Sequence, residues 1–151
     1  MMSEKRINSL KKWAFGAGIF NIVVAFPLAV PFLDKKYYAL LNLLNHILGL
    51  RGRDVAPPAD GANMLFVNTA GLALCLVGMM LIYASFDIKN RIMIPFLNAL
   101  VRMVFPILVV YYVLSENIAR IALAFAAIDV IIASGIIYYT FFLKSTGKRT
   151  S

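Results

Sequence analysis

Four long apolar runs dominate the sequence and place the strongest constraint on its fold. They cover Ala14–Leu33, Met64–Ala84, Ile92–Leu114 and Ile121–Leu143. Each run is close to the ~20 residues that a helix needs to span ~30 Å of hydrocarbon. Strands of a membrane β-barrel would be shorter and would alternate in polarity, which these runs do not do. The sequence therefore predicts an all-α integral membrane protein, a four-helix bundle that forms a single transmembrane domain over residues 1–151.

The connection between the first two runs is the only long one. Residues 37–50 are apolar except for one helical stripe of polar or small residues, namely Asn42, Asn45, His46 and Gly49. This segment is too short to span a membrane, so we expect an amphipathic interfacial helix with its polar stripe toward water or the bundle mouth. A lid packed over the bundle is the alternative. Residues 51–63 then form a loop, and residues 144–151 are expected to be a flexible tail.

The basic residues predict how the helices are oriented. The net charge is +8, and nine of the fifteen basic residues lie before the first run, between the second and third, or after the fourth. Loops with an excess of Lys and Arg usually face the cytoplasm, which predicts an N-in/C-in topology with both termini cytoplasmic. Because this topology explains the basic charge, nucleic acid is not an expected partner. The first run is too long for a signal peptide and lacks an A-x-A site, so we expect it to stay uncleaved.

Few residues offer covalent or metal chemistry. Cys75 is the only cysteine, which excludes an intramolecular disulfide and any CxxC motif. His46 is the only histidine, so the chain cannot supply the paired histidines of a b-type haem. The sequence has no Gly-rich phosphate loop, catalytic triad or paired acid motif. We therefore expect no cofactor, no metal site and no catalytic residues, and a non-enzymatic role is favoured.

Two single charges lie inside the last two apolar runs. Arg102 is the only charged residue of Ile92–Leu114, and Asp129 is the only one of Ile121–Leu143. A lone charge at membrane depth costs from ~3 to well over 10 kcal/mol and usually has a partner. The short turn between these runs predicts an antiparallel hairpin, in which Arg102 and Asp129 lie ~18 Å and ~12 Å below the turn. An arginine side chain spans that difference, so a direct pair is predicted.

Each predicted helix adds at least one strongly polar residue. Asn98 lies one helical turn from Arg102, Asn68 lies in the second run and Asn21 in the first. We expect these three asparagines to join Arg102 and Asp129 in one internal polar centre.

Three interpretations of this centre remain open. In the first it is a buried ion pair that fixes helix register. In the second it is a cavity that binds a small polar or anionic ligand with Arg102 as its cation. In the third interpretation Asp129 takes up and releases a proton, although a neighbouring arginine opposes this.

A set of polar, small and proline residues runs through all four predicted spans. Its members are Gly18 to Asn21, Asn68, Gly71, Gly78, Asp87, Arg91, Pro95, Arg102, Pro106 and Asp129. Over roughly residues 13–139 this pattern resembles small bacterial four-helix membrane proteins of the DoxX-like or BphX-like kind. Relatives often have Lys in place of Arg102 and Asn in place of Ile128. The resemblance implies a bundle with an internal polar centre in the bacterial inner (plasma) membrane, and it implies no particular reaction.

The leading functional hypothesis is a non-enzymatic membrane protein, either an accessory subunit or a small-ligand-binding bundle. The alternative is a small oligomeric transporter or proton-coupled carrier. Expected partners are membrane lipid and either a larger membrane complex or further copies of the chain.

Overall fold

The structure is a computed structural model, and it describes residues 4–147. Over this range the chain forms helices and no strand, which confirms the all-α prediction. The five helices are α1 (Glu4–Ala29), α2 (Asp34–Ile47), α3 (Gly61–Phe86), α4 (Met93–Ser115) and α5 (Ile121–Gly147).

Four of these helices, α1, α3, α4 and α5, are long and apolar enough to cross a membrane. This agrees with the four predicted spans, although several boundaries differ, above all the start of α1, which is Glu4 rather than Ala14. Helix α1 ends at Ala29 rather than Leu33, because Pro31 has no N–H to continue the helix, and residues 30–33 form a turn. Helix α5 continues to Gly147, so the predicted tail is helical over residues 144–147, and residues 148–151 lie outside the described part.

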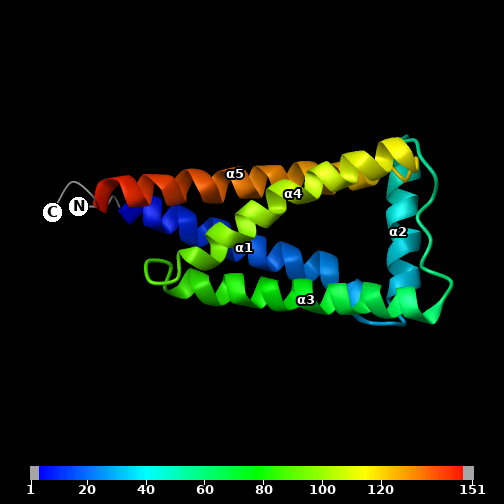
Figure 1. Ribbon diagram of the computed structural model, residues 1–151, viewed down its shortest axis with the longest axis horizontal. Coiled ribbons are helices and arrows are strands. Elements are labelled where there is room, and N and C mark those ends of the chain that lie inside the picture. Colours follow the sequence, from blue (N-terminus) through cyan, green and yellow to red (C-terminus); the bar gives the residue numbers. More distant parts are fainter. Residues whose placement is uncertain (1–3, 148–151) are drawn as a thin grey trace.

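The long helices form two antiparallel pairs that splay apart like a V (Figure 1). Helix α1 packs along α3, and α4 packs along α5. The pairs meet at the end that holds the α3–α4 turn, which we call the closed end. They separate toward the end that holds the α4–α5 turn, the open end, where α2 lies across the gap (Figure 1). The predicted hairpin of the last two spans is therefore confirmed.

Small residues allow α1 and α3 to approach closely. A Cβ on Gly78 would lie 2.8 Å from the carbonyl oxygen of Gly18, and one on Gly18 would lie 2.6 Å from that of Gly78. A Cβ on Gly71 would lie 2.5 Å from the backbone nitrogen of Ala29. The shared face of Gly71 and Gly78 is thus the face on which α3 contacts α1, as expected for small residues between membrane helices.

The packing differs between the two ends. At the closed end one buried cluster draws on α1, α3, α4 and α5, and it includes Leu10, Leu81, Ala99 and Ile136. At the open end the buried cluster joins only α4 and α5, through residues such as Val109 and Ala126. The two helix pairs therefore share a buried apolar cluster at one end only.

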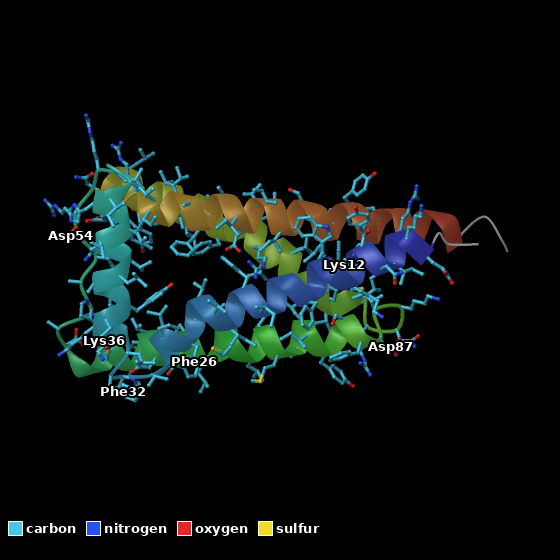
Figure 2. All side chains as sticks on the ribbon, turned by 180° about the vertical axis from the view of Figure 1, so that it is seen from behind. Lys12, Phe26, Phe32, Lys36, Asp54 and Asp87 are labelled. Carbon is cyan, nitrogen blue, oxygen red and sulfur yellow. The ribbon has the colours of Figure 1, made fainter. Side chains whose placement is uncertain are left out.

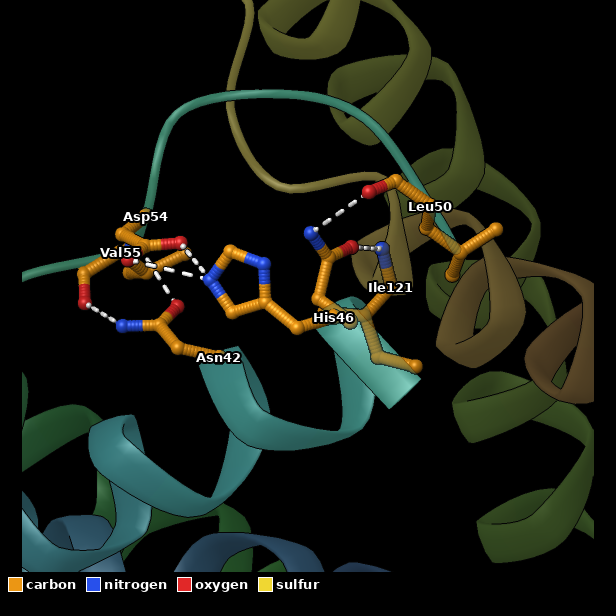
Figure 3. A network of polar contacts seen from close by, with 7 residues as sticks. Asn42, His46, Leu50, Asp54, Val55 and Ile121 are labelled. Atoms are coloured by element: carbon orange, nitrogen blue, oxygen red, sulfur yellow. Dashed lines mark hydrogen bonds and ion pairs between the residues drawn. The ribbon is translucent and has the colours of Figure 1, made fainter. Parts of the chain in front are cut away.

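Helix α2 is held by its polar stripe. Asn42 donates to the carbonyl oxygen of Val55 and accepts from its N–H, both at 2.9 Å (Figure 3). Asn45 is buried; it donates to the Leu50 carbonyl oxygen at 3.3 Å and accepts from the N–H of Ile121, the first residue of α5, at 3.0 Å. The stripe was predicted to face water or the bundle mouth. In the structure two of its members bind protein, Asn42 in the loop that follows α2 and Asn45 at the start of α5, whereas His46 is exposed and contacts Asp54.

The same loop also binds the α4–α5 turn. The backbone N–H of Arg53 donates to the carbonyl oxygen of Asn117 at 2.6 Å. The backbone N–H of Arg120 donates to the carbonyl oxygen of Arg51 at 3.0 Å. Gly52 makes this approach possible, because its φ is +109° and a Cβ there would lie 2.3 Å from the Ile118 carbonyl oxygen. Helix α2 is therefore tied to α5 at its C-terminal end and to α1 by a short turn at its N-terminal end. It spans residues 34–47 rather than 37–50, and the loop spans 48–60 rather than 51–63.

Candidate functional site

The structure brings the two intramembrane charges together. A guanidinium nitrogen of Arg102 on α4, Nη1, forms an ion pair with Oδ1 of Asp129 on α5. The two side chains are 6% and 13% exposed, so the pair is almost completely buried. The distances estimated along the predicted helices therefore gave the correct partner.

Arg102 also binds the first helix. Its Nη2 donates to Oδ1 of Asn21 and, at 3.4 Å, to the carbonyl oxygen of Ala17. Within α4, its Nε donates to Oδ1 of Asn98 at 2.9 Å. A single guanidinium thus joins α1, α4 and α5. Because α1 belongs to one helix pair and α4 and α5 to the other, Arg102 lies where the two arms of the V meet.

Asn68 does not join this network. Its side-chain amide donates to the carbonyl oxygen of Leu28 at 2.7 Å, near the open end. Helix α1 stops at Ala29, so the Leu28 carbonyl has no further helical turn to supply an N–H. Asn68 therefore caps the end of α1. Of the five residues predicted for the polar centre, Asn21, Asn98, Arg102 and Asp129 cluster and Asn68 lies elsewhere.

A cavity of about 330 Å³ extends from this cluster toward the open end. Asn21, Asn98, Arg102 and Asp129 all line it, and they form its polar floor. Its walls are apolar and largely aromatic, with side chains from all five helices. The aromatic members are Phe20, Tyr37, Tyr38, Phe105 and Phe125. Small-molecule sites in proteins are usually clefts of about 300–1,000 Å³ with apolar walls and a few polar groups, which describes this cavity.

The polar floor still has hydrogen-bonding capacity. A guanidinium has five N–H donors, and four of those on Arg102 reach the partners described above. The other carboxylate oxygen of Asp129, Oδ2, accepts no hydrogen bond from residues 4–147. Arg102 and Asp129, which both line the cavity, therefore keep one donor and one acceptor that no described residue binds.

Helix α2 adds no charged side chain to the lining of the cavity. Tyr37, Tyr38 and Leu41 line it from this helix. Burial raises the pKa of both tyrosines above the ordinary value of 10, and for Tyr38 the nearby Asp34 raises the pKa further. Both hydroxyls are therefore neutral at physiological pH.

The cavity also reaches the outer surface between α3 and α4. Three of its lining residues are large apolar side chains that are exposed on the outside of the bundle, Leu74 by 46%, Val101 by 68% and Phe105 by 41%. In a membrane this surface would contact lipid tails.

No group of three or more His, Cys, Asp or Glu side chains that could hold a metal is found within the described range. Comparisons of the chain with models of known protein families, with curated proteins and with solved structures find no match. The resemblance to DoxX-like proteins therefore stays a prediction.

The cavity walls were missed by the sequence analysis, although a signal for them was present. On α4, Asn98, Arg102 and Phe105 share one helical stripe, and on α5 Phe125 lies one turn before Asp129. Each charged residue thus has an aromatic residue about one turn closer to the open end. What the stripes could not reveal is that the helices splay and leave space there.

Proposed function

We propose that this chain is an integral membrane protein that binds a small, largely apolar molecule in the cavity between its two helix pairs. The observation that carries this proposal is the polar floor of the cavity. There the Arg102–Asp129 ion pair still has one N–H and one carboxylate oxygen without a partner among the described residues, below walls with several aromatic side chains. Binding rather than catalysis is proposed because the floor offers hydrogen bonds and no nucleophile or paired acids. The chemistry of the floor and walls supports this role independently of any relative.

The proposal includes a location and an orientation. The excess of basic residues at the closed end supports cytoplasmic termini. The bacterial inner membrane is proposed from the resemblance to DoxX-like proteins alone. Helix α2 would then lie at the outer surface, where it closes the cavity toward water. Kinship with DoxX-like proteins and a role as an accessory subunit are compatible with this arrangement, and the polar residues that carry the resemblance include three of the floor, Asn21, Arg102 and Asp129.

Transport is less well supported than binding. A carrier must open its site alternately to both sides of the membrane. Here the closed end is filled by a buried cluster in which Leu10, Leu81 and Ile136 are fully buried. Opening it would require the four helices to separate where they pack best.

Blocking the cavity tests the proposal. Ala122 lines the cavity from α5, whereas Ala127, on the same helix, is exposed on its outer surface. We expect 4-butylphenol to bind the wild-type protein in nanodiscs saturably, to bind Ala127→Phe equally well, and to lose binding in Ala122→Phe. Isothermal titration calorimetry with empty nanodiscs subtracted measures this. Val101→Trp, at the exposed mouth, is a second blocking variant that leaves the buried packing unchanged. Equal heats for all four proteins would mean that the probe only partitions into lipid, and the proposal would be wrong.

A further inference from the structure

We infer that the ligand is electrically neutral and that its polar end both donates and accepts a hydrogen bond, as a phenol or an alcohol does. Under this assignment, which rests on the proposed function, the Arg102–Asp129 pair selects for ligands without net charge. It differs from the expectation drawn from the sequence, in which Arg102 was the cation for an anionic ligand.

The first argument is charge balance. Among the described residues that line the cavity, only Arg102 and Asp129 are charged, and they form an ion pair with each other. The floor therefore has no net charge. A ligand carrying a carboxylate or an ammonium group would bring an uncompensated charge into a buried apolar space, which is strongly unfavourable.

Basic residues near the open end do not change this balance. They are Lys35 and Lys36 on α2, Arg51 and Arg53 in the loop that follows it, and Arg120 in the α4–α5 turn, and all five are exposed. None of them lines the cavity. Charges in contact with water are screened over about 8–10 Å at physiological salt, so they have little influence on a group at the floor.

The second argument is the pattern of free hydrogen-bonding groups. Arg102 has one N–H left and Asp129 has one oxygen, Oδ2, that no described group binds. A hydroxyl satisfies both, because it donates to the carboxylate and accepts from the guanidinium. A carboxylate only accepts and an ammonium only donates, so each would leave one of the two groups without a partner.

The third argument concerns the walls and the route of entry. Phe20, Phe105 and Phe125 surround the space above the floor, and the cavity opens between α3 and α4 where Leu74 and Val101 are exposed. Ligands that enter from the hydrocarbon region are enriched in neutral, apolar molecules. The entry route and the floor therefore select for the same chemistry.

Four probes with one shared body test the inference. They are butylbenzene, 4-butylphenol, 4-butylbenzoate and 4-butylbenzylamine, titrated into the full chain in neutral-lipid nanodiscs at pH 7. We expect 4-butylphenol to bind about fivefold tighter than butylbenzene, from one net hydrogen bond. The two charged probes should bind at least about tenfold more weakly than the phenol. Tighter binding of the benzoate than of the phenol would overturn the inference while leaving the proposed function intact. If none of the probes binds in a way that Ala122→Phe abolishes, the proposed function itself fails.

Charge variants give the second readout. In Asp129→Asn the guanidinium loses its counter-charge, so the preference should reverse and 4-butylbenzoate should bind about tenfold or more tighter than the phenol. Asp87→Asn, at the closed end far from the cavity, is the matched control and should keep the wild-type order (Figure 2). If Asp129→Asn does not fold, the neutral double variant Arg102→Gln/Asp129→Asn replaces it and should still disfavour both charged probes. An unchanged order in a folded Asp129→Asn protein, or tight benzoate binding by the double variant, would contradict the inference.

Discussion

A double-mutant cycle on Arg102 and Asp129 should show that this pair holds the two arms of the V together. Arg102→Met removes three hydrogen bonds between helices, those to Asp129, Asn21 and the Ala17 carbonyl oxygen. Such contacts are worth about 0.6–1.7 kcal/mol each in membrane proteins, so the expected loss of stability is about 2–5 kcal/mol. Asp129→Asn keeps the shape of the side chain but leaves the guanidinium without its counter-charge, which costs about 3–5 kcal/mol in a buried pair.

The double variant distinguishes a coupled pair from two independent residues. Arg102→Met/Asp129→Asn has neither charge, so no uncompensated ion remains. We expect it to be more stable than the sum of the two single losses predicts, by a coupling energy of about 1–3 kcal/mol. Equilibrium unfolding by SDS in mixed micelles, followed by circular dichroism, measures all four free energies of unfolding.

The matched control is a second ion pair, that of His46 with Asp54. Its nitrogen and oxygen are 3.1 Å apart, but its side chains are 63% and 55% exposed. Exposed pairs contribute about 0–1 kcal/mol, so a cycle of His46→Ala and Asp54→Asn should give little coupling. If the losses at Arg102 and Asp129 add to within about 0.5 kcal/mol, the pair does not act as a unit and the reasoning is refuted.

Two further predictions concern packing and the attachment of α2. Gly78→Ala places a Cβ 2.8 Å from the Gly18 carbonyl oxygen and should lower the free energy of unfolding by about 1–3 kcal/mol. The control is Gly16→Ala, whose Cβ meets nothing within 4 Å and which should be neutral or slightly stabilising in the same unfolding assay. Asn45→Ala leaves the Ile121 N–H without its buried acceptor and should lower the free energy of unfolding by about 1–3 kcal/mol. Proteolysis of the loop after α2 should become faster. An unchanged cleavage rate would show that Asn45 does not hold α2 in place.

The helices and the ion pair could be predicted from the sequence because both depend on local regularities. Apolar runs of bilayer length give the spans, and a rise of about 1.5 Å per residue places Arg102 and Asp129 at compatible depths. Asn21 and Asn98 follow from the same reasoning. Asn68 does not, because its partner is the Leu28 carbonyl oxygen, which is free only because α1 ends at Ala29.

The role of α2 depends on contacts between distant segments. Its polar stripe was correctly found as a helical pattern, but polarity alone indicates water as readily as it indicates a buried partner. Asn45 binds Ile121, 76 positions away in the chain, and Gly52 packs against Ile118. Neither contact leaves a periodic signal. The position of α2 across the gap between the helix pairs, where it lines the cavity, was therefore not predictable.

A structural role and a binding role for Arg102 and Asp129 are compatible in this architecture. Both side chains are almost completely buried, and both line the cavity, where Oδ2 of Asp129 has no partner among the described residues. The contacts of Arg102 to Asn21, Ala17 and Asn98 also prevent the guanidinium from turning toward a ligand. Its remaining N–H is therefore held in place before any ligand arrives, and such preorganisation lowers the entropic cost of binding. The network that stabilises the vertex of the V is thus the same network that fixes the geometry of the site.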